Sequence, residues 1–377
     1  MNINTGELSI EACKSMVVNH MCAQGVLRNN NVAVVAEAMW RDADEAEAAE
    51  LASLPVLDIN RHQVEYLQTI GDGWASPLKR FMNELELLEV MNMKTITDAN
   101  GKRNLLSVPI TQDVSTEDKA RLEGAAKIAI KCTEIGSDAV LAVINNPCFF
   151  DNRKEEICAR TFGCMSANHP KAVTIFAQGD HLVSGESMRF ITRPVFNDGN
   201  DQYRLTPAQI KAKIVEKDAD VVYAFQVRNP LHNGHVLLLK DTRQQLIAQG
   251  YRNPILLLHP LGGWCKDDDV PLTDRMAQHA ALLSDNTLEP EHTILAVWPS
   301  PMYYGGPTEV MWHASSRVNC GITHFITGRD PAGVKHPETG SDLYDVWHGQ
   351  KLLVHCKQML NGVDVLPFKV AAYNTVN

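Results

Sequence analysis

The sequence lacks any apolar run long enough to cross a membrane. Its apolar stretches, such as residues 139–144 and 255–258, have the length of strands and are interrupted by polar residues. The first residues also lack the basic segment and apolar core that mark a secretory signal. These absences predict an intracellular protein without a membrane partner. The cytoplasm is the favoured location, and a plastid or another organelle stays open.

An excess of positive charge is also missing. Acidic residues outnumber basic ones, and the formal net charge is -10. Proteins that bind nucleic acids usually carry a basic face, so we expect no nucleic-acid partner. Small anions are not excluded, because a site can be locally positive on an acidic protein.

The spacing of metal-binding cysteines is absent too. The nine cysteines are scattered, odd in number and without a C-x-x-C pair. This pattern indicates reduced thiols rather than a disulfide framework or a zinc site. A run of three acids, Asp267, Asp268 and Asp269, is interpreted as a solvated loop more readily than as a metal site. We therefore expect no metal ion held by the protein itself.

The chain has 377 residues, which is long enough for two domains with buried cores. Residues 1–50 are interpreted as an appendage or linker, with a helix over residues 9–27. Residues 51–203 contain short apolar runs between turn signals, which predicts a β-rich domain with a few helices. The runs lie at residues 104–110, 139–144, 172–176 and 188–195.

Residues 204–377 show a different pattern, in which predicted strands and helices alternate. Thr206 and Pro207 suit the cap and first position of a helix. Such alternation predicts a doubly wound parallel sheet, which binds ligands beyond the carboxyl ends of its strands. The sequence predicts strands over 221–227, 254–259, 293–298, 324–327 and 363–370, and helices over 230–249, 273–284 and 308–319.

The most informative segment is QVRNPLHNGH, residues 226–235, which leaves a buried strand and enters a helix. A helix N-terminus presents free N–H groups and a positive dipole end to an anion. His232 and His235 are three residues apart and share one helical face, and Gly234 allows a ligand to approach closely. Imidazoles can donate hydrogen bonds to phosphate oxygens. The segment therefore predicts a site for the phosphates of a nucleotide.

H-x-G-H after a first strand resembles the signature of the nucleotidylyltransferases. The preceding Gln-Val-Arg-Asn resembles the narrower ATP sulfurylase family. Two further segments resemble the same family, GRDPAG at residues 328–333 and PFKVAAY at residues 367–373. The resemblance covers residues 51–377 and is strongest to the sulfurylase half of the animal-type bifunctional PAPS synthases. No G-x-x-x-x-G-K-[ST] loop of a kinase is present.

The resemblance implies a fold, a reaction and a set of residues. The fold is a PUA-like domain followed by a Rossmann-like nucleotidylyltransferase domain. The reaction joins sulfate to the α-phosphate of ATP, with magnesium carried by ATP, and gives adenylylsulfate (APS) and pyrophosphate. The residues with direct roles in catalysis are Arg228, Asn229, His232, His235 and Arg329. The substrate-binding residues are Gln226, Val227, Arg228, Asn229, Gly328, Arg329, Asp330, Pro331, Ala332, Val370 and Ala371.

Within that set, the resemblance assigns sulfate to Gln226, Arg228 and Arg329 and to the backbone near Ala332. Asn229 is expected at the triphosphate. The two histidines are expected at the phosphates, where they would stabilise charge in the transition state. The loop Gly328, Asp330, Pro331 and Ala332 would shape the nucleotide pocket, and Val370 and Ala371 would flank the adenine.

Three hypotheses stay open at this point. The first is an active ATP sulfurylase, a homodimer or larger, whose product and pyrophosphate link it to APS kinase and pyrophosphatase. Family members usually continue past residue 373 with a further loop and a small helical subdomain. The second hypothesis is therefore a subunit that binds nucleotide but is catalytically weak. The third is a nucleotidylyltransferase with another acceptor, although Arg228 and Arg329 argue for a small anion.

Overall fold

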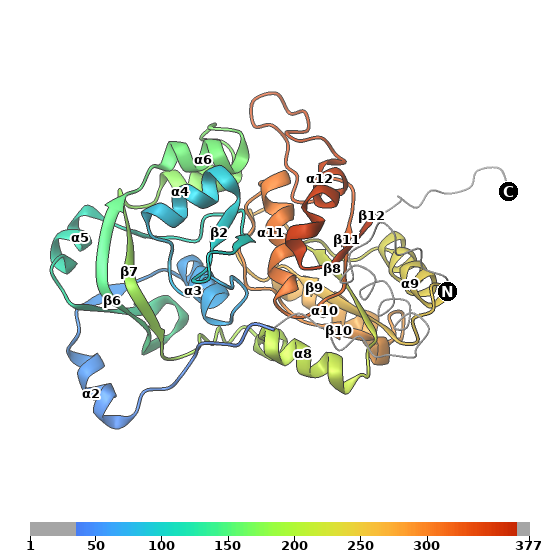
Figure 1. Ribbon diagram of the computed structural model, residues 1–377, viewed down its shortest axis with the longest axis horizontal. Helices are drawn as coiled ribbons and strands as arrows, with labels where there is room; N and C mark the ends of the chain where they lie inside the picture. The colour runs from blue at the N-terminus through green and yellow to red at the C-terminus, as the bar shows by residue number, and fades with distance from the viewer. Residues whose placement is uncertain (1–34, 368–377) are drawn as a thin grey trace, which may run out of the picture.

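A computed structural model describes residues 35–367. The helix predicted over residues 9–27 lies outside this range. The described part contains two five-stranded sheets, one in each half of the chain, with a long helix between them (Figure 1). The placement of the two predicted domain boundaries, at residues 50 and 203, stays a prediction.

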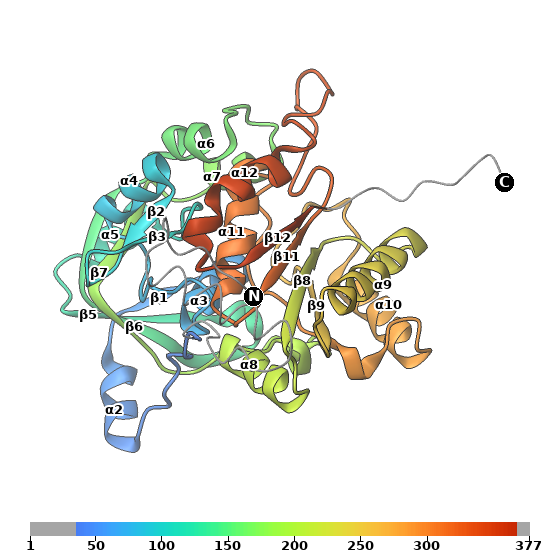
Figure 2. The ribbon, with the colours of Figure 1, turned by 45° about the vertical axis from the view of Figure 1, so that its right-hand side comes forward.

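The sheet of the N-terminal half has the strand order β1-β5-β6-β7-β4. β1 and β5 are parallel, and the other neighbours are antiparallel. A separate antiparallel pair, β2 and β3, lies toward the second half (Figure 2). The strands are β1 Val56–Asp58, β2 Thr95–Thr97, β3 Arg103–Leu105, β4 Gln112–Val114, β5 Lys127–Cys132, β6 Ser137–Asp151 and β7 His181–Phe190.

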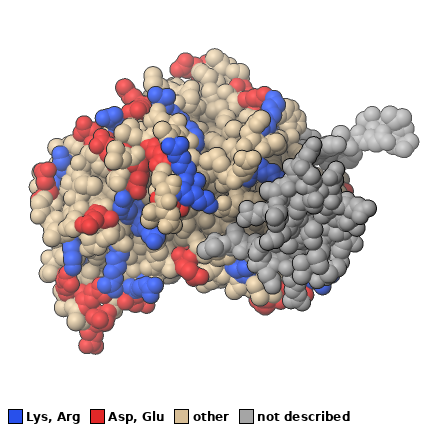
Figure 3. Space-filling model, in the orientation of Figure 1, with Lys and Arg blue, Asp and Glu red and all other residues tan. Residues whose placement is uncertain are grey.

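Six helices accompany these strands within residues 35–203. They are α2 Glu45–Ser53, α3 Arg61–Gly71, α4 Glu84–Met93, α5 Thr116–Leu122, α6 Lys154–Phe162 and α7 Pro170–Phe176. The charged helix α2 stands away from the rest of the fold (Figure 1), where acidic side chains gather on the surface (Figure 3). The apolar run 172–176 belongs to helix α7, which is thus one of the few helices of the β-rich half. His169 caps its N-terminus and Pro170 occupies the first turn, so the local signals favour a helix.

The sheet of the C-terminal half is entirely parallel, with the order β10-β9-β8-β11-β12. Strands β9 and β10 therefore lie on one side of β8, and β11 and β12 lie on the other side. This reversal of the strand order confirms the predicted doubly wound sheet, and it creates a topological switch point between β8 and β11. The strands are β8 Val221–Val227, β9 Pro254–Pro260, β10 Thr293–Leu295, β11 His324–Thr327 and β12 Asp364–Pro367.

Helices cover both faces of this sheet (Figures 1 and 2). They are α8 Pro207–Glu216, α9 Asn233–Ala248, α10 Leu272–Ser284, α11 Pro307–Val318 and α12 His348–Cys356. The side chains of β8 alternate between two cores, one shared with α9 and α10 and the other shared with α11 and the N-terminal half. Thr206 caps α8 with a capping box to Gln209, as its sequence predicts. No helix in residues 35–367 is long and apolar enough to span a bilayer.

Candidate active site

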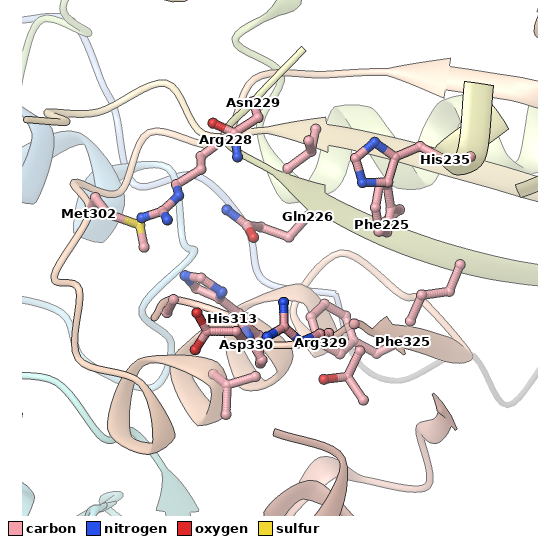
Figure 4. Close-up of a pocket in the computed structure, with 18 of the residues that line it drawn as sticks. Phe225, Gln226, Arg228, Asn229, His235, Met302, His313, Phe325, Arg329 and Asp330 are labelled. Atoms are coloured by element: carbon pink, nitrogen blue, oxygen red, sulfur yellow. The ribbon is translucent and has the colours of Figure 1, made fainter. Parts of the chain in front are cut away.

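A cavity of about 530 Å³ opens at the switch point between β8 and β11 (Figure 4). Its walls come from the end of β8, the start of α9, the loop after β11 and one face of α11. The lining residues include Phe225, Gln226, Val227, Arg228, Asn229, His232, His235, Met302, His313, Phe325, Thr327, Gly328, Arg329, Asp330, Pro331 and Ala332. The position agrees with the rule that ligands bind beyond the carboxyl ends of parallel strands.

The start of α9 holds two histidines in a fixed arrangement. His232 is the N-cap, and its Nδ1 accepts from the Gly234 N–H at 3.1 Å. The His235 Nδ1 lies 3.4 Å from the backbone N–H of His232, and the two rings stack with centroids 3.8 Å apart. Since each Nδ1 accepts, the hydrogen-bond network assigns the proton of each neutral ring to Nε2. Both rings then keep one N–H donor for a ligand.

The charge state of His235 follows from its surroundings. Burial, followed by the neighbouring His232, lowers the pKa of His235 to about 4. The ring is therefore neutral near pH 7. It can offer a hydrogen bond to a phosphate oxygen without serving as a cation.

Arg228 is held at the other side of the same cavity. Its guanidinium lies over the ring of Tyr304, 5.1 Å from the centroid, and donates to the Gly333 carbonyl at 3.3 Å. The Arg228 Nη1 and the Gln226 Nε2 are buried and have no hydrogen-bond partner within residues 35–367. Buried donors without a partner are uncommon. These two groups are thus available to a small oxyanion.

The loop after β11 forms the third wall, and its backbone is unusual. Asp330 and Ala332 both adopt left-handed conformations, with φ of 49° and 56°. Three contacts hold this backbone. The Asp330 N–H donates to the Val346 carbonyl at 2.7 Å, and the Gly306 N–H donates to the Ala332 carbonyl at 3.0 Å. The His348 Nε2 lies 3.1 Å from the Pro331 carbonyl. Strained loops of this kind persist where neighbouring structure fixes them, often at binding sites.

Gly333 completes this loop. A Cβ at Gly333 would lie 1.9 Å from the Asp330 Oδ1, so any other residue here would have to displace the Asp330 side chain. Asp330 lines the cavity, and burial, with a smaller contribution from Asp342, raises the pKa of its carboxyl above the ordinary value. The loop therefore combines fixed backbone with one carboxyl group that is less acidic than usual.

Comparisons with known proteins agree with this geometry. A profile of the ATP-sulfurylase family matches residues 201–377, and a profile of the PUA-like domain matches residues 29–191. ATP sulfurylase 2 of Arabidopsis thaliana is 42% identical over 330 residues, which cover 87% of this chain and 68% of that protein. A sulfate adenylyltransferase of Deinococcus deserti is 32% identical, with 89% of this chain and 79% of that protein covered. The chain belongs to the ATP sulfurylase family.

A solved structure shares the fold. The hexameric APS kinase from Thiobacillus denitrificans aligns with a TM-score of 0.63 and 19% identity, over 89% of this chain. This chain spans 56% of the length of that solved chain. The fold class predicted for an ATP sulfurylase, a PUA-like domain followed by a parallel α/β domain, is confirmed.

The cavity gathers the sequence-predicted residues of an ATP sulfurylase that lie in the described range. The residues from 226 to 229, the two histidines, and the loop 328–332 all line it. Val370 and Ala371 lie outside the described residues. The assignment of individual roles to these side chains stays a prediction.

Several residues of this ATP sulfurylase site were missed by the sequence interpretation. His313 lines the cavity from α11, and its Nε2 lies 3.2 Å from the buried carboxylate of Glu309. Glu309 also accepts from the N–H groups of Tyr303 and Gly305, at 2.9 and 3.0 Å. This carboxylate fixes the loop that carries Tyr304. The only local signal was the i,i+4 spacing of Glu309 and His313 in a segment that otherwise indicates core.

Proposed function

We propose that this chain is a sulfate adenylyltransferase, which transfers the adenylyl group of MgATP to sulfate. The observation that carries the proposal is the pair of unpartnered buried donors, Gln226 Nε2 and Arg228 Nη1, beside a helix N-terminus that carries two histidines. A small oxyanion and a nucleotide phosphate chain can thus be held side by side. Membership of the ATP sulfurylase family supports the same reaction.

The reaction is an in-line displacement at the α-phosphorus. A sulfate oxygen forms a bond to phosphorus while the bond from phosphorus to the bridging oxygen breaks, and its electron pair leaves with pyrophosphate. Sulfate is a dianion at neutral pH, so the reaction needs no general base. The difficulty is that a dianion must approach a polyanion, and the site must neutralise charge and fix the geometry.

The residues divide this work between them. Arg228, with its planar fork of donors, holds the sulfate together with Gln226 and Arg329. His232 and His235 donate Nε2–H groups to phosphate oxygens as negative charge moves onto pyrophosphate. Asn229 contacts the triphosphate, and the loop 328–332 orients the nucleotide. Magnesium is part of the nucleotide substrate, since this ion prefers phosphate oxygens and water to cages built wholly of protein.

The proposal extends to the cellular setting. We place the reaction in the cytoplasm and expect a homodimer. The phosphosulfate anhydride is costly to form, so we expect a functional link to an APS kinase that consumes the product and to a pyrophosphatase that removes pyrophosphate.

The test is ATP formation from adenylylsulfate and pyrophosphate with magnesium, which runs in the favourable direction. We expect turnover by the purified chain and its loss by at least about a hundredfold in Arg228→Ala, because a charge-assisted contact to a dianion disappears. Arg252→Ala, at an exposed position away from the cavity, is the matched control and is expected to keep full activity. Binding of adenylylsulfate without turnover would instead support the alternative of a catalytically weak subunit.

A further inference from the structure

Arg317 of α11 is a cation buried without an acidic partner. Its side chain is 0% exposed, and its guanidinium lies 4.2 Å from the centroid of the Trp298 ring and 5.8 Å from that of Phe325. Nη1 donates to the carbonyl of His313 at 2.7 Å. Nε and Nη2 have no hydrogen-bond partner in the part of the chain that the structure describes.

The surroundings of Arg317 do not neutralise its charge. Burial lowers the pKa of Arg317 to about 9, which leaves it protonated at neutral pH. Burial, with the nearby Arg317, holds the pKa of His259 well below its ordinary value, so that ring is neutral. Burial also raises the pKa of Cys320 to about 12, so this neighbour is a thiol. Between residues 35 and 367, no Asp or Glu forms an ion pair with Arg317.

A charge in this situation destabilises the fold, and an apolar side chain of similar size would remove that cost. Local conflicts of this kind are expected at functional sites, where stability is given up for another property. The location of Arg317 suggests what that property is.

Arg317 lies directly behind one wall of the active-site cavity. His313, one helical turn earlier on α11, lines the cavity, and so does Phe325, whose ring faces the guanidinium. Figure 4 shows His313 and Phe325 on one side of the cavity, with Arg228 and Asn229 on the other. One helical turn and one aromatic ring separate the charge from the cavity, so we take its distance from a bound ligand as about 10 Å. Arg317 is thus too far away to touch a ligand but close enough for its field to reach it.

We propose that Arg317 is a specificity-determining residue that favours doubly charged over singly charged oxyanions through its electric field alone. The inference rests on the proposed binding of sulfate in this cavity. A charge about 10 Å away, in a medium of effective dielectric constant near 20, strengthens binding by roughly tenfold for each unit of ligand charge. A dianion therefore gains roughly a hundredfold and a monoanion roughly tenfold.

The experiment compares two tetrahedral anions of different charge, sulfate and perchlorate. Their dissociation constants are measured by calorimetry on the full chain and on Arg317→Met, which keeps length but removes charge. We expect the variant to lose roughly a hundredfold for sulfate and roughly tenfold for perchlorate. Its free energy of unfolding should be unchanged or higher. Equal losses for the two anions, or no loss for either, would overturn the proposal.

A second variant serves if Arg317→Met does not fold. Arg317→Lys keeps a cation, but buried lysines have pKa values lowered by several units, so this cation is lost within the accessible pH range. We expect its sulfate affinity to weaken from pH 6 to pH 8 relative to the wild-type chain, with a change in log Kd about twice that for perchlorate. A pH profile that parallels the wild type for both anions would contradict the proposal. Because binding is measured, the result is separate from turnover: a chain without adenylyl transfer can still discriminate by charge.

Discussion

The guanidinium of Arg228 lies over the ring of Tyr304, 5.1 Å from its centroid, although the two residues are far apart in the sequence. Tyr304 has a left-handed backbone, with φ of 54°, and its hydroxyl accepts from the Lys266 N–H at 2.8 Å and donates to the Asp269 carboxylate at 2.5 Å. The ring is therefore a fixed platform for the arginine that we assign to sulfate.

Removing this platform is expected to weaken sulfate binding. In Tyr304→Leu the cation–π contact is lost and Arg228 gains freedom, so we expect the KM for sulfate to rise by roughly tenfold, while the KM for ATP changes less. Tyr304→Phe is the control, because it keeps the ring and loses only the hydroxyl. A similar rise in both variants would assign the effect to the hydroxyl contacts rather than to the ring.

A second prediction concerns the helix that supports the nucleotide loop. Gly349 of α12 packs against the loop, and a Cβ there would lie 2.4 Å from Pro331 Cγ and 2.9 Å from Thr327 Oγ1. Gly349→Ala should therefore displace the loop and raise the KM for ATP by roughly tenfold, despite the gain of up to about 1 kcal/mol in helix propensity. Val354→Ala, on an exposed position of the same helix, is expected to leave the KM unchanged. An unaltered KM in Gly349→Ala would show that the loop can yield without loss of binding.

Glu309 gives a third prediction, on stability and on sulfate binding together. Its carboxylate accepts from two backbone N–H groups and contacts His313, all in a buried site. In Glu309→Gln an amide N–H must face one of these donors, so we expect the free energy of unfolding to fall by about 3 kcal/mol. The loop that carries Tyr304 should loosen, which raises the KM for sulfate. Urea denaturation and steady-state kinetics measure the two effects, and Glu291→Gln on the exposed surface should change neither.

The fourth prediction concerns acid stability. His279 of α10 is fully buried, and its ring nitrogens have no hydrogen-bond partner in residues 35–367. Burial, with a smaller contribution from the positive charge of Arg275, lowers the pKa of His279 to about 4. The unfolded chain binds a proton near pH 6.5 and the folded chain does so only near pH 4, so stability is lost as the pH falls through this window. Integration over the window gives about 3 kcal/mol.

His279→Leu should remove this share of the pH dependence. We therefore expect the free energy of unfolding of the variant to fall by about 3 kcal/mol less than that of the wild type between pH 7 and pH 4. Urea denaturation at the two pH values measures the difference. Parallel losses in the two proteins would mean that the ring becomes protonated without cost in the folded state.

The parallel sheet was the part of the fold best predicted from the sequence. The strand over 221–227 is observed with those bounds as β8, because it is an apolar run between clear breakers. The helices of the N-terminal half were less visible. In α3 the polar residues Gln68 and Thr69 are buried by tertiary contacts, which no local pattern reveals.

The site shows the same division between local and tertiary signals. The segment 226–235 could be predicted because strand, turn and helix N-terminus follow one another along the chain. The segment 328–333 was found by its resemblance to the ATP sulfurylase family, at the end of a strand. The contacts from Glu309 and His313 could not be predicted, since they depend on how α11 packs beneath the sheet, and their side chains gave only the signals of an ordinary buried helix. The contact from Tyr304 depends in turn on the loop that Glu309 holds.

The placement of α11 also has a consequence for how the protein can change. Every residue of this helix after Pro307 is buried. Two hydrogen bonds tie the helix to the N-terminal half. Ser107 Oγ donates to the Thr308 carbonyl at 2.6 Å, and Asn319, which follows the helix, donates to the Trp74 carbonyl at 2.9 Å. One hydrophobic core thus contains residues from both halves. The two halves should therefore unfold in a single thermal transition, and neither should fold as an independent module in another protein. A substitution in the PUA-like half can thus alter the geometry of the active-site cavity without contacting it.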